Sequence, residues 1–163
     1  MIIKVKNKES LIFDDFIFRC AVGKKGISSR KKEGDFCTPR GSFNLGIVYY
    51  RSDRIKNIKT KLKLIKIKKN MGWCNDPRSK KYNSLIKIKD RFKHEKLHRK
   101  DNKYDIIVVI KYNFKKPIPF NGSAIFLHLT KHYKGTAGCI ALSKNDLLIL
   151  LRLINKKTKI RIF

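Results

Sequence analysis

The spacing of apolar and polar positions along this chain of 163 residues predicts a series of short β-strands. Residues 61–68, KLKLIKIK, alternate between lysine and apolar side chains, as expected for a strand with one buried and one solvated face. Residues 104–112, YDIIVVIKY, are apolar almost throughout, which is typical of a strand covered on both faces. Further strand-like segments lie at 2–6, 16–22, 42–50, 123–129 and 158–163.

One helix is predicted near the end of the chain, at residues 143–154, SKNDLLILLRLI. Ser143 is a suitable N-cap, and Asp146 lies near the positive end of the helix dipole. The leucines of this segment form a wide apolar face. The pattern as a whole therefore predicts a single, mainly β domain over residues 1–163, with this one late helix.

Three segments show neither the helical nor the strand periodicity of apolar residues. They are rich in turn-forming residues and are predicted to be irregular. Residues 23–41 are rich in glycine, lysine and serine and are expected to form a solvated, mobile loop. Residues 71–83 read as an irregular loop, and the prolines of residues 117–122 exclude regular structure there. The strands are thus expected to be separated by turns, with no interdomain linker.

The formal charge of +29 is large, but it is weak evidence for a particular binding partner. A polyanionic partner is one explanation. However, the basic residues are spread evenly, alternate with apolar ones, and accompany abundant isoleucine and asparagine, which is the residue mix that AT-rich codons give. No nucleic-acid-binding motif is present, so no specific nucleic-acid partner is expected.

Membrane and redox signals are weak in this sequence. No run approaches the roughly 18 apolar residues of a membrane span, and the first residues lack the apolar block of a signal peptide. We therefore expect a cytoplasmic chain, or one whose export signal is missing from this sequence. Its cysteines, without any C-x-x-C pair, are expected to be free thiols; they are Cys20, Cys37, Cys74 and Cys139.

A cysteine and a histidine within residues 126–146, FLHLTKHYKGTAGCIALSKND, form the main candidate for chemistry. Cys139 follows Gly138, whose backbone freedom allows a turn in which N–H groups converge on the sulfur and on a developing oxyanion. His128 ends an apolar run, so a strand would hold it while the loop returns Cys139 beside it. His132 lies in that loop, exposed or facing a substrate. On these residues alone, a buried thiol and a core histidine remain an alternative.

Residues 94–98, HEKLH, suggest a competing interpretation. On a helix, His94 and His98 would share a face and bind zinc, with Glu95 as general base. Few apolar residues flank this segment to anchor such a helix, and no later glutamate exists to serve as a third ligand. A zinc hydrolase is therefore the less favoured hypothesis, and no metal or organic cofactor is expected.

Taken in order, these motifs resemble the L,D-transpeptidase catalytic domain family, the YkuD domain. The resemblance extends from about Cys20 to the end of the chain. It rests on TPRGSF (38–43), GWCNDPRSKKYN (72–83), HEKLHRKDNKYD (94–105), SAIFLHL (123–129) and TAGCIAL (136–142).

The resemblance implies a β-sandwich-like fold with the cysteine in a cleft. Members of the family cleave a peptidoglycan tetrapeptide stem after its third residue, release D-alanine, and transfer the acyl group to an amine. Carried over, Cys139 would be the nucleophile and His128 its base, with the N–H groups of Gly138 and Cys139 as the oxyanion hole. The residues implied for substrate binding are Thr136, His132, Trp73 and His94.

Two positions depart from the usual family pattern. Ala137 stands where members commonly have a second histidine, which leaves His128 as the base. Ala141 stands where many members carry a polar residue near the substrate, so the stem carboxylates must be bound by other side chains. The candidates for that binding are Arg40, Arg78, His132 and Lys134.

The sequence thus favours a peptidoglycan L,D-transpeptidase with roles in cell-wall synthesis and cell shape, acting in the periplasm or cell wall. Two alternatives stay open: a peptidoglycan hydrolase or amidase with the same Cys–His pair, and a basic binding protein without enzymatic activity. The zinc match at residues 94–98 is then expected to be coincidental.

Overall fold

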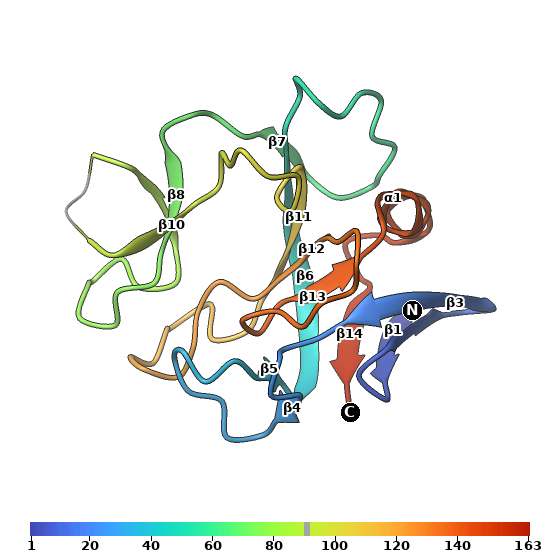
Figure 1. Cartoon of the computed structure of the whole chain (residues 1–163), viewed down its shortest axis with the longest axis horizontal. Coiled ribbons are helices and arrows are strands. Elements are labelled where there is room, and N and C mark those ends of the chain that lie inside the picture. Colours follow the sequence, from blue (N-terminus) through green and yellow to red (C-terminus); the bar gives the residue numbers. More distant parts are fainter. Residues whose placement is uncertain (90–91) are drawn as a thin grey trace.

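Strand β6 (Gly41–Tyr50) closes a ring of hydrogen-bonded strands in this computed structural model, which describes residues 1–89 and 92–163. The first part of β6 pairs antiparallel with β14 (Lys159–Ile162), and the second part pairs antiparallel with β11 (Ile106–Ile110). From β14 the ladder continues through β1, β2, β3, β13 and β12 and returns to β11. The sheet is therefore barrel-like (Figure 1).

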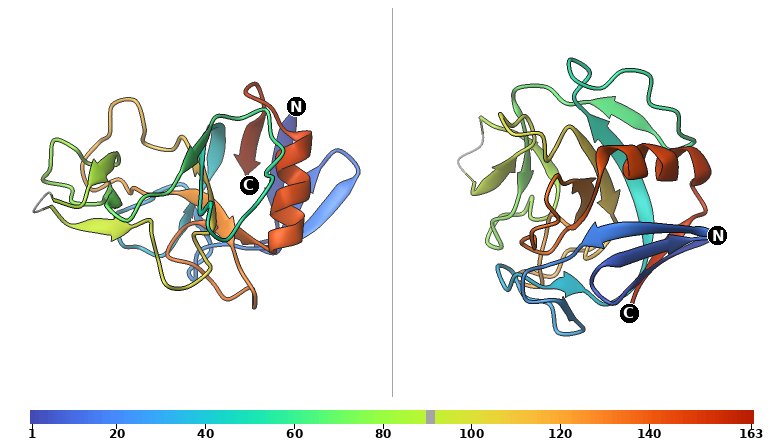
Figure 2. Two further views of the ribbon diagram at one scale, coloured as in Figure 1. Left: turned by 90° about the horizontal axis from the view of Figure 1, so that it is seen from above. Right: turned by 45° about the vertical axis from the view of Figure 1, so that its right-hand side comes forward.

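The other strands of the ring are β1 (Ile2–Lys6), β2 (Ser10–Phe13), β3 (Phe16–Ala21), β12 (Phe126–Leu129) and β13 (Ile140–Leu142). The strands outside it are β4 (Ile27–Ser28), β5 (Thr38–Pro39), β7 (Leu64–Lys66), β8 (Met71–Cys74), β9 (Leu85–Lys87) and β10 (His94–Lys96). Strands β8, β9 and β10 form a separate three-stranded sheet, while β4 pairs with β5 and β7 with β6. Both views of Figure 2 place the chain termini on the side of α1, away from that small sheet.

The prediction of a mainly β chain is confirmed, but the prediction of a sandwich is wrong. A sandwich needs two separate layers that face each other. Here β6 is long enough to hydrogen-bond to two different partners along its length, so one sheet curls round and joins itself.

Strand β11 separates two apolar clusters. Ile106, Val108 and Ile110 belong to the main core inside the barrel. Ile107 and Val109 belong to a second cluster on the other face, which also contains Cys139, Trp73, Tyr104 and Phe126. All five residues of β11 are buried, as the apolar run predicted. The second cluster contains Cys139 and packs beneath the candidate site.

The predicted helix is confirmed as α1 (Lys144–Leu153). The Ser143 hydroxyl accepts a hydrogen bond from the backbone N–H of Asp146 at 3.1 Å, which caps the first turn. The buried leucines of α1 belong to the main core. In the part of the chain that the structure describes, no helix is long and apolar enough to cross a membrane.

Several short elements differ from the predictions. The segment 61–68 forms a strand only at Leu64–Lys66, and the predicted loop 71–83 begins with strand β8. The HEKLH segment forms strand β10, which pairs with β8. The helix that a zinc site at residues 94–98 would need is therefore not formed.

Candidate active site

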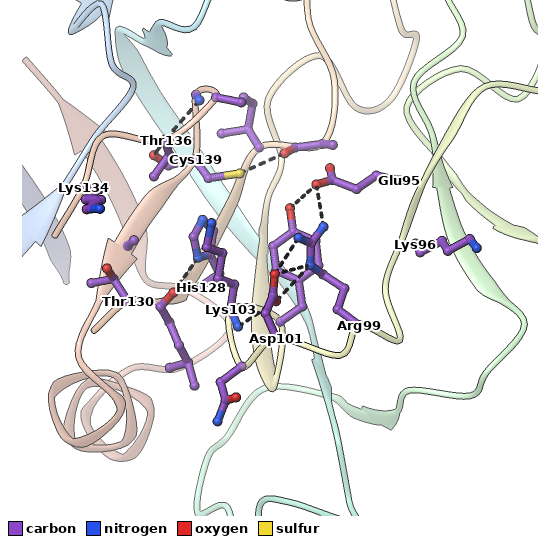
Figure 3. A pocket seen from close by; sticks show the side chains of 18 of the residues that line it. Glu95, Lys96, Arg99, Asp101, Lys103, His128, Thr130, Lys134, Thr136 and Cys139 are labelled. Carbon is purple, nitrogen blue, oxygen red and sulfur yellow. Dashed lines mark hydrogen bonds and ion pairs between the residues drawn. The ribbon is translucent and has the colours of Figure 1, made fainter. Parts of the chain in front are cut away.

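Strands β12 and β13 bring the two predicted catalytic residues together. The strands are parallel neighbours in which His128 pairs with Ala141, and Cys139 lies immediately before β13. Because side chains alternate along a strand, Cys139 and Ala141 point to the same face as His128. Figure 3 shows the ring of His128 beside the side chain of Cys139.

Both side chains line a cleft of about 1480 Å³. One wall consists of the TAGC loop and the residues around β12. The other wall consists of β10 and the segment that leads from β10 to β11, and residues from the loop after β4 complete the rim. The thiol and the imidazole thus lie where a ligand bound between the barrel and the small sheet would reach them.

The Cys139 thiol is protonated in the resting site. Its Sγ donates a hydrogen bond to the backbone carbonyl of Ala124 at 3.1 Å, and the residue is only 7% exposed. Burial, together with the negative charge of Glu95, raises the pKa of Cys139 to about 12. Lys31 and the Tyr104 hydroxyl act in the opposite direction, since each favours the thiolate.

His128 is neutral and is held in the tautomer that a base requires. Its Nδ1 lies 2.9 Å from the carbonyl oxygen of Leu129, and because a carbonyl only accepts, Nδ1 carries the proton. The lone pair is therefore on Nε2. Burial lowers the pKa of His128 to about 4, so the ring stays uncharged at neutral pH. The ring also packs edge-on against Tyr104, with 5.4 Å between ring centroids.

The loop before Cys139 is held by the Thr136 hydroxyl. Its Oγ1 donates to the carbonyl of Cys139 at 2.6 Å and accepts from the N–H of Gly138 at 3.0 Å. The Gly138 N–H, predicted to line the oxyanion hole, is thus already bonded. The Cys139 N–H has no hydrogen-bond partner among residues 1–89 and 92–163, and it remains the candidate oxyanion donor beside the sulfur.

The segment 23–41 is mostly exposed or partly buried, as its composition predicted, but its few buried residues support this loop. Thr136 forms a β-bridge with Gly23 and accepts a hydrogen bond from the N–H of Lys24 at 2.9 Å. The fully buried Thr38, from the TPRGSF motif, accepts from the N–H of Gly23 at 2.8 Å. The motif therefore stabilises the catalytic loop indirectly: Thr38 holds Gly23, and Gly23 and Lys24 contact Thr136 of the loop.

A group on the opposite wall was not found from the sequence. The buried Tyr104 donates a hydrogen bond from its hydroxyl to Oε1 of Glu95 at 2.6 Å, and the Arg99 guanidinium lies over its ring at 5.1 Å. Arg99 in turn is paired with Asp101 at 2.7 Å. Tyr104 opens the apolar run 104–112, so the sequence pattern assigned it to the strand and gave no sign of the contact with Glu95.

The predicted substrate-binding residues do not all lie in the cleft. His94, His132 and Thr136 line it. Trp73 does not, because it is 3% exposed, donates from Nε1 to Asn83 Oδ1 at 2.9 Å and packs on Phe126. We therefore assign Trp73 to the support of the site. Among the candidates for carboxylate binding, Lys134 and His132 line the cleft, whereas Arg40 and Arg78 do not.

The HEKLH histidines are not arranged as a zinc site would require. His94 lies in β10, where its Nδ1 contacts the carbonyl of Phe92 at 2.8 Å. Within the described residues, no group of three or more histidine, cysteine, aspartate or glutamate side chains is placed to hold a metal ion.

The site thus combines a buried cysteine and a neutral histidine on adjacent strands of a barrel-like sheet, both open to one cleft. Comparison with protein families matches the model of the L,D-transpeptidase catalytic domain (YkuD) over residues 3–162. The chain belongs to this family, as the resemblance of its motifs indicated. A comparison with curated proteins gave no match.

Proposed function

We propose that this protein is a peptidoglycan L,D-transpeptidase that uses Cys139 as nucleophile and His128 as base. One observation carries the proposal. A protonated thiol and a neutral imidazole share one face of adjacent strands, and the Cys139 N–H beside them has no hydrogen-bond partner in the described parts of the chain. Members of the family are cysteine-dependent transpeptidases that act on peptidoglycan peptides.

In the first half-reaction, the Cys139 sulfur attacks the carbonyl carbon of the third residue of a tetrapeptide stem. The thiol proton passes to Nε2 of His128, and the oxyanion accepts a hydrogen bond from the Cys139 N–H. The C–N bond to D-alanine then breaks, and the imidazolium gives its proton to the leaving amine. The products are a thioester on Cys139 and free D-alanine.

In the second half-reaction, an amine attacks the thioester carbonyl and loses a proton to Nε2 of His128. The C–S bond breaks, and the leaving sulfur takes this proton back, which restores the thiol. Because burial disfavours both the free thiolate and the free imidazolium, the charged pair should exist only while the substrate is reacting. This protects the thiol from other electrophiles in the absence of substrate.

We further propose that the protein acts in the periplasm or cell wall, where stem peptides are linked, and contributes there to cell shape. If water replaced the amine in the second step, the same site would work as a hydrolase. The products of the reaction distinguish these two outcomes.

The experiment that tests the proposal is intact-protein mass spectrometry after mixing with a disaccharide-tetrapeptide. We expect a mass gain equal to the donor minus D-alanine in the wild type and none in Cys139→Ala. Adding an amine acceptor should remove the adduct and yield a cross-linked product. If folded wild-type protein forms no adduct and releases no D-alanine, the proposal is wrong.

A further inference from the structure

Glu95 is a carboxylate on the cleft wall whose ion pair with Arg99 is long. Nη1 of Arg99 lies 3.9 Å from Oε1. Arg99 directs Nε and Nη2 at Asp101 instead, at 3.0 Å and 2.7 Å. Oε1 holds the Tyr104 hydroxyl, and Oε2 has no hydrogen-bond partner in the described parts of the chain. Figure 3 shows Glu95 across the cleft from Cys139 and His128.

The cleft around Glu95 is rich in cationic side chains. Many lysines and arginines line the same cleft, so any carboxylate there could readily find a cation. Asp101 and Asp105 are paired closely with Arg99 and Arg54, whereas Glu33, like Glu95, is held by a tyrosine hydroxyl. Glu95 is therefore held by Tyr104 with one oxygen left for a ligand, and a half-buried carboxylate whose only ion pair among the described residues is this long one favours a cationic ligand.

Tyr104 connects Glu95 to the reacting groups. It is 5% exposed, and its ring packs edge-on against His128. Its hydroxyl and the Glu95 carboxylate affect Cys139 in opposite ways. The hydroxyl favours the thiolate and lowers the pKa of Cys139, whereas the negative charge of Glu95 raises it. A ligand that neutralises Glu95 thus removes one of the two influences that keep the thiol protonated, while burial remains.

We propose that Glu95 binds a primary ammonium group of the peptide substrate and that this contact, acting through Tyr104, prepares Cys139 for attack. The ammonium pairs with Oε2 and neutralises the carboxylate. The Tyr104 hydroxyl, held less strongly by Glu95, then strengthens the interaction that it already has with the sulfur. The ammonium belongs either to a side chain of the donor stem or to the incoming acceptor amine. The choice of substrate rests on the proposed function, whereas the coupling between Glu95 and Cys139 does not.

The first test needs no peptidoglycan. The rate at which iodoacetamide modifies Cys139 is measured near neutral pH by peptide mass spectrometry, in propylammonium chloride and in potassium chloride at equal concentration. The more exposed Cys37 serves as an internal reference. A fall of one unit in the pKa of the thiol raises its thiolate fraction about tenfold and lowers its nucleophilicity about threefold, so we expect a net gain of roughly threefold with propylammonium.

Variants separate this coupling from a general loosening of the site. Glu95→Gln keeps an oxygen for Tyr104 but removes the charge. It should react about threefold faster than the wild type and no longer respond to propylammonium. Tyr104→Phe keeps the ring but removes the hydroxyl, and should react about threefold more slowly. Glu9→Gln, outside the cleft, should match the wild type. A purely structural role would change both cleft variants in the same direction.

The proposal is overturned if propylammonium has no effect on wild-type Cys139, or if it acts equally on Glu95→Gln. A response of the thiol without any acyl-enzyme from the tetrapeptide would support the coupling and count against the proposed function alone. The source of the ammonium follows from acylation assays. If acetylation of the donor side-chain amine prevents acylation in the wild type but not in Glu95→Gln, the donor supplies it. If only transfer depends on Glu95, the acceptor does.

Discussion

Gly138 packs so closely against the backbone of Cys37 that a Cβ at position 138 would lie 2.8 Å from the Cys37 carbonyl oxygen. Its φ angle is 141°, in a region that side chains disfavour. The contact joins the catalytic loop to the segment 23–41. The residue before the nucleophile is therefore positioned by a part of the chain about a hundred residues earlier.

Replacing this glycine should damage the site more than the fold. We expect Gly138→Ala to lower the free energy of unfolding by about 1–3 kcal/mol and to reduce acylation at least about a hundredfold, because the Cys139 N–H and sulfur must move together. Denaturant unfolding and acyl-enzyme formation measure the two effects. Gly34→Ala is the control, since Gly34 also has a positive φ but meets nothing within 4 Å. Equal losses of acylation in both variants would contradict the role of the contact.

The Thr136 hydroxyl should matter for the shape of the catalytic loop. Thr136→Val keeps the volume but loses both bonds, to the Cys139 carbonyl and the Gly138 N–H. We expect acylation to fall about tenfold to a hundredfold, mostly in kcat, because the nucleophile is less well oriented. Thr136→Ser retains the hydroxyl and should recover most of the rate. If Ser and Val are equally impaired, the loop does not depend on these bonds.

His128 should make stability depend on pH on the acid side. Its pKa is about 4 in the folded protein and about 6.5 when exposed, so the unfolded chain binds an extra proton as the pH falls through this window. The contribution is complete above about pH 6.5, and about 3 kcal/mol of it is lost by pH 4. In His128→Gln, the free energy of unfolding measured with denaturant should fall less between about pH 6.5 and pH 4 than in the wild type, by about this amount.

Asn83 should be one of the more important buried polar side chains. Its Oδ1 accepts from Trp73 Nε1 and from the Ala124 N–H, and its Nδ2 donates to the carbonyls of Tyr112 and Asn113 at 3.0 Å and 2.7 Å. Asn83→Ala leaves these groups unpaired, and we expect a loss of about 3 kcal/mol or more in denaturant unfolding.

A matched control exists for this prediction. Asn57 has a similar positive φ of 54°, compared with 55° at Asn83, but is exposed. Asn57→Ala should therefore cost about 1 kcal/mol or less, mainly through its backbone conformation. A comparable loss at both positions would mean that the hydrogen bonds of Asn83 contribute little.

The fold was predictable where the local pattern is long enough to show a period. The apolar run that became β11 and the capped helix α1 are of this kind. Strands β8 and β10 have four and three residues, too few to show alternation, and they form because they pair with each other. The HEKLH spacing suited a helix, but pairing across the small sheet prevailed. Closure of the barrel depends on pairing of β6 with β11 and β14, which are distant in sequence, and a local sequence pattern cannot predict such pairing.

The candidate site was predictable in its chemistry and less so in its supports. The order of motifs led to Cys139 and His128, and the register of β12 and β13 brings them to one face. Trp73 was expected to contact substrate because loop composition does not distinguish a cleft wall from a core position. Tyr104 was missed because its role depends on a contact with Glu95 that only the folded chain makes.

The place of β14 between β1 and β6 constrains how the chain folds. Strand β1 comes from the start of the sequence and β14 from its end, and they lie side by side in parallel register. This pairing requires closure of a loop almost as long as the chain, so it should be a late and slow event in folding. Until it occurs, β1 and β6 each present an unpaired edge to other chains. Refolding yield should therefore fall with protein concentration, and removal of the last strand should favour aggregation.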